Sequence, residues 1–391
     1  MGPIARTSTA AVVAVALSAL AACGTSDADH GTQRADSAGV EIITYSGPDR
    51  MLDWRFEPTF TLGGEDTDEE SFYELSAAYV GTDADGNLYI LDTSAKRVVV
   101  FDAEGNYLRT MGGEGGGPGE MRFPFALGVS PTGVASAFDI SKRALVRFGP
   151  DGAVLDEIRV TFPYGGGPIV DRDGTLVVPV QDLDTESATY TDRLLAITGA
   201  DTLRVVRHVR PAGGAIVLES CGMQLFGATP VFSPTMRWSA SGEGVAVVTS
   251  SGYDIAFYRG DTVTRVLRRA LEPGRATREA AAASVGDGMR VVAAGVVRIC
   301  DSEEVVEQRG FAETIPVIGG LVQGPEGTLW VRRSAGPGSP APIDVFDRDG
   351  TYLGTLPDGT PFPVAVFREQ IAAIETDEAD VDRLAVYRID K

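Results

Sequence analysis

The sequence predicts an all-β fold, a six-bladed β-propeller with a small helical insertion, and three observations predict it. A unit made of a turn, an apolar strand, a link, a second apolar strand, a turn and a third strand recurs along the chain. These strands are short and almost continuously apolar, which is typical of strands that are buried on both faces when blades stack around a channel. A further strand lies before the first unit and can complete the last one, so that the ring closes.

The repeat is clearest in its first copy, residues 81–110. The next stretch of chain repeats this copy in register. Its two turn glycines, Gly133 and Gly152, follow Gly86 and Gly105 by the same offset of 47 residues. Because two independent turns share one offset, the unit is a true internal repeat, and such repeats indicate a repetitive architecture.

Weaker copies begin near Asp171, Ser241 and Pro325, and a sixth, partial copy runs from Val364 to the end of the chain. The sixth copy lacks an outer strand. The strand at 56–62 can supply it, and joining the two termini in one blade would remove the exposed sheet edges. We therefore expect six blades, with seven as the alternative.

One segment, about residues 272–310, departs from this pattern and predicts the helical insertion. Pro273 suits the start of a helix, and good helix formers follow at 277–284. Ser302 with two glutamates after it indicates a second helix start. We expect this segment to lie between two blades, either as a peripheral excursion or as a lid over the central pocket.

The N-terminus predicts export. A short basic start at Arg6 precedes an apolar run of about thirteen residues, whereas a helix needs roughly twenty to span a bilayer. Residues 1–22 therefore have the proportions of a signal peptide. The run ends in Leu-Ala-Ala-Cys23, which resembles the lipobox of bacterial lipoproteins. That resemblance implies cleavage before Cys23 and a diacylglycerol on its thiol; the alternative is an ordinary cleavage site beside an incidental cysteine.

The segment that follows, residues 23–39, is rich in small and polar residues and contains no aromatic side chain. Such a composition buries too little apolar surface to offset the entropy of ordering, so we expect a flexible tether before a propeller at 40–391. By resemblance to enterobacterial sorting, Gly24 in place of Asp favours the outer membrane. The expected location is the bacterial cell envelope, on the periplasmic face.

A glycine-rich stretch at 112–124 carries a family resemblance. Its sequence, GGEGGGPGEMRFP, resembles the G-x-G-x-GPGEF-x-x-P signature of NHL-like six-bladed propellers, and especially the lipoproteins known as 6-bladed β-propeller proteins. The match is strong over 73–152 and diffuse over the rest of the mature chain. This resemblance implies the fold, but the group as a whole implies no settled activity.

The charge of the chain limits its partners. The net charge of −21 argues against binding nucleic acid and against direct binding to anionic lipid. We expect the membrane to be contacted only through the lipid anchor. A cationic partner or an envelope protein is compatible with this charge, and we expect a monomer.

Cys221 and Cys300 are the two cysteines left once Cys23 is assigned to lipid. An oxidising compartment favours a disulfide between them. The alternative is a pair of separate buried thiols, because sequence alone does not bring two Cα atoms within bridging distance. Neither cysteine lies near a candidate base, so we expect no catalytic thiol.

Acidic residues offer two candidate sites. Asp92 and Asp139 end equivalent strands of the first two copies, so they could line the channel mouth. Arg97 and Arg143 are interpreted as matched positions that pair with these acids structurally. Three turns of the form Asp-x-Asp-Gly suggest Ca²⁺, although they lack the later bidentate acid of a calcium loop and also suit tight hairpins. These turns carry Asp83 and Asp85, Asp171 and Asp173, and Asp347 and Asp349.

We expect no resident cofactor, with Ca²⁺ as the alternative. The chain has only two histidines, His30 and His208, so it cannot build the histidine-rich zinc site of the amidating lyases related to NHL proteins. The expected function is a binding or scaffold module for a protein or a small ligand, with the channel face as the default ligand site. One alternative is a lactonase-like hydrolase with a metal in the channel. Another is a glycan-binding module, which exposed aromatics such as Trp238 or Trp330 on a rim would support.

Overall fold

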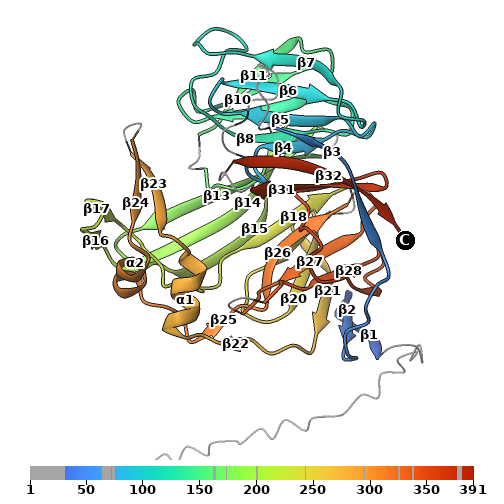
Figure 1. Cartoon of the computed structure of the whole chain (residues 1–391), viewed down its shortest axis with the longest axis vertical. Helices are drawn as coiled ribbons and strands as arrows, with labels where there is room; N and C mark the ends of the chain where they lie inside the picture. The colour runs from blue at the N-terminus through green and yellow to red at the C-terminus, as the bar shows by residue number, and fades with distance from the viewer. Residues whose placement is uncertain are drawn as a thin grey trace, which may run out of the picture.

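The computed structural model describes residues 31–63, 72, 75–161, 164–172, 174–199, 201–242, 244–293, 296–324, 326–336, 339–376 and 381–391. These residues form six blades of antiparallel strands and two short helices, so the prediction of an all-β six-bladed propeller with a small helical insertion is confirmed (Figure 1). The first 30 residues, including Cys23 and the expected signal peptide, lie outside the described part of the chain.

The first three blades follow one another along the chain, each with its first strand innermost. Blade 1 contains β4 (Val80–Thr82), β5 (Leu88–Asp92), β6 (Arg97–Phe101) and β7 (Tyr107–Gly112). Blade 2 contains β8 (Pro124–Val129), β9 (Ala135–Asp139), β10 (Ala144–Phe148) and β11 (Val154–Arg159). Blade 3 contains β12 (Val170–Arg172), β13 (Thr175–Asp184), β14 (Thr189–Thr198) and β15 (Asp201–Pro211).

The other three blades complete the ring. Blade 4 contains β18 (Arg237–Ser241), β19 (Gly244–Val248), β20 (Asp254–Arg259) and β21 (Thr262–Arg269). Blade 5 contains β26 (Ile318–Gln323), β27 (Leu329–Arg333), β28 (Ile343–Phe346) and β29 (Tyr352–Thr355). Blade 6 contains β30 (Ala365–Phe367), β31 (Gln370–Thr376), β32 (Asp382–Asp390) and, as its outer strand, β3 (Arg55–Leu62).

The ring closes through both ends of the chain. Strand β3 pairs antiparallel with β32, with Arg55 opposite Asp390, as the sequence predicted for residues 56–62. Each inner strand contacts the inner strands of the two neighbouring blades, and β30 contacts β4. Six inner strands therefore surround the axis, and the alternative of seven blades is excluded.

Packing between blades explains the apolar strands. Every residue of β5, β9 and β19 is buried, because a neighbouring blade covers each face of these strands. Near the axis the inner strands approach closely. A Cβ at Gly81 would lie 2.6 Å from the Val129 side chain, so a glycine is needed where β4 meets β8.

The N-terminal segment adds two strands to the outside of blade 4. Strands β1 (Thr32–Ser37) and β2 (Val40–Tyr45) form a hairpin, and β2 pairs in parallel with β21. The expectation of a flexible tether up to residue 39 therefore does not hold for residues 32–37. Backbone pairing with β2 orders this segment even though its own side chains are polar and mostly exposed.

Two excursions from the ring lie against each other. The hairpin of β16 (Ile216–Leu218) and β17 (Met223–Leu225) leaves the chain between blades 3 and 4. The second excursion lies between blades 4 and 5 and is the predicted insertion. It contains β22 (Gly274–Arg275), α1 (Arg278–Val285), β23 (Met289–Ala293), β24 (Val296–Cys300), α2 (Ser302–Arg309) and β25 (Thr314–Ile315).

Both predicted helices of the insertion are confirmed. The Thr277 side chain accepts the Ala280 N–H at 3.1 Å and caps α1, while Asp301 accepts the Glu304 N–H at 2.9 Å and caps α2. The insertion also holds two strand pairs that the sequence did not predict, β22 with β25 and β23 with β24. Neither helix is long and apolar enough to cross a membrane, nor is any other helix in the described residues.

Candidate functional site

Asp92 ends β5, is buried, and serves the turn between β5 and β6. Its carboxylate accepts the N–H groups of Ser94 and Ala95 at 3.1 and 2.9 Å. The expected pairing with Arg97 is present, because Arg97 Nε donates to the other carboxylate oxygen at 3.0 Å. All of these contacts stabilise the end of β5 and the turn that follows it, so both oxygens of the Asp92 carboxylate already accept hydrogen bonds from the protein.

Asp139 has the same role in blade 2. It is fully buried and accepts the backbone N–H groups of Arg122, Phe123 and Lys142 at 2.5, 3.1 and 2.9 Å. Arg143 is exposed, and within the described residues it forms no ion pair with Asp139. The expected pair of Asp139 with Arg143 is therefore wrong.

The reason is that the residue of the second copy that matches Arg97 is Ala144, one position after Arg143. Arg143 and Lys96 share a left-handed backbone, with φ of 53° and 56°. Arg97 stands opposite Asp92 in the β5–β6 register, whereas Ala144 stands opposite Asp139 in the β9–β10 register. Arg143 is thus the counterpart of Lys96 in a tight turn, and Ala144 takes the position opposite Asp139.

The Asp-x-Asp-Gly turns bind their own backbone. Asp83 accepts the Asn87 N–H at 2.9 Å, Asp171 accepts the Gly174 N–H at 2.8 Å, and Asp347 accepts the Thr351 N–H at 2.8 Å. Asp173 lies outside the described residues. Across the described part of the chain, no group of three or more His, Cys, Asp or Glu residues is placed to hold a metal ion.

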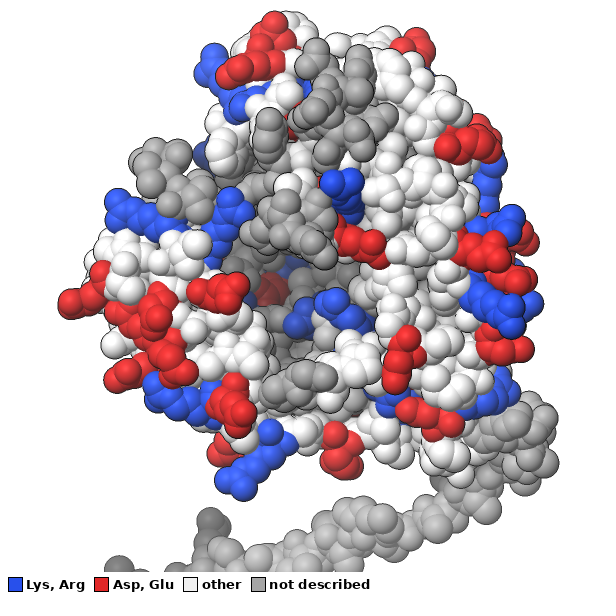
Figure 2. Space-filling view, in the orientation of Figure 1, with Lys and Arg blue, Asp and Glu red and all other residues white. Residues whose placement is uncertain are grey.

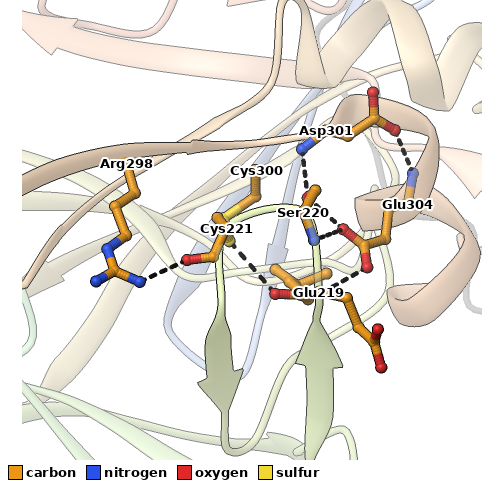
Figure 3. The surroundings of a disulfide bond; sticks show 8 residues. Glu219, Ser220, Cys221, Arg298, Cys300, Asp301 and Glu304 are labelled. Atoms are coloured by element: carbon orange, nitrogen blue, oxygen red, sulfur yellow. Dashed lines mark hydrogen bonds between the residues drawn. A yellow bond between two sulfur atoms is a disulfide. The ribbon is translucent and has the colours of Figure 1, made fainter.

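Cys221 and Cys300 form a disulfide, with their Cα atoms 4.8 Å apart (Figure 3). The bond joins the β16–β17 hairpin to the end of β24. Beside it, the Glu304 carboxylate accepts the N–H groups of Glu219 and Ser220 at 2.6 and 3.0 Å, and Arg298 donates to the Cys221 carbonyl at 2.8 Å. These contacts make the hairpin 216–225 and the insertion 274–315 one body, which we call the insertion unit.

A pocket of about 710 Å³ lies between the insertion unit and blades 4 and 5. On the propeller side, it is lined by the start of β18, by β26 and by the end of β27; on the other side, it is lined by α1 and β23. Figure 2 shows a hollow near the middle of this face, with basic and acidic side chains around it. This pocket is the candidate functional site.

Four arginines line the pocket, and Arg333 is the only one of them that forms an ion pair within the described residues. Within the described residues, Arg237 and Arg332 form no ion pair, and the lining contains no Asp or Glu. Arg332 lies over the Phe362 ring, 4.8 Å from its centroid. Both residues are exposed to the pocket; partial desolvation and the nearby charge of Arg332 lower the pKa of Arg237, and partial desolvation lowers the pKa of Arg332. The pocket is therefore a positively charged region of a chain whose net charge is −21.

The packing of blades 4 and 5 brings these two arginines together. Strands β18 and β26 are joined by a hydrogen bond of 2.9 Å from the Gln323 N–H to Ser239 Oγ. Arg332 stands opposite Gly320 in the β26–β27 register. A Cβ at Gly320 would lie 3.0 Å from the Phe362 ring, so glycine leaves the space in which this ring supports the Arg332 guanidinium.

The other two arginines of the pocket are held by the fold. Arg309 at the end of α2 donates to the Thr229 carbonyl at 2.8 Å. Arg333 donates to Asp49 at 2.6 Å and lies 3.6 Å from the Asp344 carboxylate. Burial acts to raise the pKa of Asp49, but hydrogen bonds from Arg333 and Arg269 outweigh it and lower that pKa.

Sequence reasoning missed this pocket. Arg237, Arg309 and Arg332 come from β18, α2 and β27, and no motif links them. Of the two tryptophans expected to support a glycan-binding rim, Trp330 is 1% exposed and packs against Trp54 and Phe56, so it cannot serve a rim. Trp238 is half-buried.

Comparisons with known proteins agree with the fold. Residues 76–162 match the model of a family, DUF5128, described as 6-bladed beta-propeller. No curated protein sequence matches the chain. Among solved structures, a candidate exported protein from Bacteroides fragilis NCTC 9343 is 15% identical, with a TM-score of 0.54 over 90% of this chain and 100% of that chain.

Two further structures are similar at lower scores. A member of the DUF4221 family from Bacteroides vulgatus is 11% identical, with a TM-score of 0.49 over 86% of this chain and 99% of that one. A gluconolactonase from Xanthomonas campestris is 14% identical, with a TM-score of 0.36 over 88% of this chain and 99% of that one. At 15% identity, the likeness to the Bacteroides fragilis structure shows the fold alone.

Proposed function

We propose that this protein is a binding module whose pocket holds a small anionic ligand between Arg237 and Arg332. The observation that carries the proposal is the pair of guanidinium groups that face one pocket without an acidic partner among the described residues. A guanidinium is planar and offers a fork of N–H donors that matches a carboxylate, sulfate or phosphate group. Because the two charges also repel each other, an anion between them would relieve an unfavourable interaction.

The shape of the pocket supports a small molecule. Its volume of about 710 Å³ lies within the range of small-molecule sites, roughly 300–1,000 Å³. The described lining holds no His, Cys, Asp or Glu that could act as a general base or a metal ligand. We therefore propose binding rather than hydrolysis.

The cellular setting of the module is part of the same proposal. The lipobox-like sequence before Cys23 supports a lipid anchor, and Gly24 favours the outer membrane of a bacterial envelope, with the propeller on the periplasmic face. The net charge of −21 supports a protein that does not bind nucleic acid and that touches lipid only through the anchor. We propose that the propeller acts as a monomer.

Isothermal titration of the mature chain carrying Cys23→Ser tests the proposal, with acetate, sulfate and inorganic phosphate as separate probes. We expect at least one anion to bind with millimolar affinity or better, and Arg237→Gln or Arg332→Gln to weaken it at least tenfold. Arg268→Gln is the matched control, since Arg268 is in blade 4, as Arg237 is, and pairs with Asp254 on the surface. An absence of binding by all three anions, or binding that both pocket variants retain, would overturn the proposal.

A further inference from the structure

The two sides of the pocket differ in chemistry. The propeller side presents Arg237, Arg332 and the hydroxyl of Ser334. Besides Ser284 and Arg309, the opposite side presents apolar side chains, among them Ala283 and Val285 of α1 and Met289 of β23. A free inorganic anion between Arg237 and Arg332 would leave these apolar side chains against water.

The link between the β16–β17 hairpin and blade 4 extends the apolar side. Val231 and Phe232 of this link line the pocket, and Phe232 has a φ of 66°. A bulky residue rarely adopts this left-handed conformation, which is a strained one for it, and such strain is concentrated at functional sites. Hydrogen bonds from the Val231 N–H to the Gly310 carbonyl (3.0 Å) and from the Ala312 N–H to the Val231 carbonyl (2.8 Å) hold the link in place.

From this arrangement we infer that the ligand is an amphiphilic anion, with an acidic group between Arg237 and Arg332 and an apolar body against Phe232, Val285 and Met289. This inference rests on the proposed function and names the class of its ligand. The acidic group provides the hydrogen bonds and the charge, while the apolar body removes from water the surface that the insertion unit presents. Medium-chain carboxylates are the simplest molecules of this class.

Three probes separate the parts of the inference: octanoate carries both the anion and the chain, acetate carries the anion alone, and 1-octanol carries the chain alone. Each buried methylene contributes about fourfold in affinity, so burial of only half of the extra chain of octanoate gives well over tenfold. We expect titration of the mature Cys23→Ser chain to show octanoate at least tenfold tighter than acetate and than 1-octanol. Arg237→Gln should weaken octanoate and acetate and leave 1-octanol unchanged.

Variants of the apolar side complete the test. Met289→Gln keeps the length of the side chain but adds polarity, and we expect it to weaken octanoate at least fivefold without changing acetate. Ala283 lies on the exposed face of α1, so the variant Ala283→Asn tests the same side of the pocket if Met289→Gln disturbs folding. Val217→Gln is the control, because Val217 is an exposed apolar residue of the same insertion unit outside the lining of the pocket.

The outcomes are distinct. Equal affinities of acetate and octanoate would overturn this inference and leave the proposed anion site standing. Binding of 1-octanol as tight as that of octanoate, insensitive to Arg237→Gln, would overturn the role of the acidic group. Failure of octanoate, acetate, sulfate and phosphate alike would overturn both the inference and the proposed function.

Discussion

Replacement of Asp344 by Asn tests the argument that a buried ion pair fixes blade 5 to blade 4 and so positions the arginines of the pocket. Asp344 is 0% exposed and the Arg269 side chain 1% exposed, and their closest atoms are 2.7 Å apart. The Asp344 carboxylate also accepts the hydroxyl groups of Tyr253 at 2.9 Å and Thr355 at 2.7 Å. Loss of its charge would leave Arg269 buried with only Asp49 as an acidic partner.

The magnitude follows from this burial. Removal of one partner of a buried pair costs about 3–5 kcal/mol, because the remaining charge is desolvated without compensation. Since Asp49 still pairs with Arg269 in the variant, we expect a loss near the low end, about 3 kcal/mol. Asp254→Asn is the control: Asp254 pairs with Arg268 at 2.8 Å, but the two side chains are 46% and 47% exposed, so its loss should lie between 0 and 1 kcal/mol.

Equilibrium unfolding in urea, followed by tryptophan fluorescence and circular dichroism together, measures both losses. Coincident transitions by the two probes justify a single free energy of unfolding. A loss for Asp344→Asn no larger than that for Asp254→Asn would refute the reasoning, since it would mean that the buried pair does not hold the two blades together.

Three other changes follow from the contacts. The double change Cys221→Ser and Cys300→Ser should destabilise the insertion unit by about 2–4 kcal/mol, seen as faster amide hydrogen exchange in that unit and unchanged exchange in blade 1. Asp49→Asn should reduce stability at pH 7 and should cost progressively less as the pH falls below 3.8, because the folded pKa of Asp49 is lowered from 3.8: its contribution is present above that value and is lost as the pH falls through the folded pKa. Gly81→Val should cost about 1–3 kcal/mol in urea unfolding by overpacking against Val129, whereas an unchanged midpoint would show that the inner strands have room to separate.

The turns made the fold predictable from sequence. Gly86 and Gly105 have φ of 79° and 89°, a conformation that glycine adopts without a steric penalty. Their repetition 47 residues later marks the same two turns in the next blade, so the period of the sequence is the period of the ring. The apolar strands between the turns then specify burial on both faces, and the unpaired strand at 56–62 specifies closure.

The site was predictable only in part. The role of Asp92 could be anticipated, because its partners lie within five residues of it. The same offset of 47 residues assigns Arg143 to Lys96, so that error could have been corrected from the sequence alone. The pocket could not be found in this way, since Arg237, Arg309 and Arg332 become neighbours only through the packing of blades 4 and 5 and the insertion unit.

The insertion unit is held together by contacts between its own parts. Its two ends are paired to each other at β22 and β25, the disulfide joins its two excursions, and the link at 231 is bonded to residues 310 and 312. The bond from Arg309 to the Thr229 carbonyl also joins α2 to the link that leads into blade 4. With the unit in this position, the pocket is formed without a ligand. A ligand that enters a pocket already formed avoids the cost of ordering its walls, and the arginines and apolar side chains of the lining then select it by its chemistry.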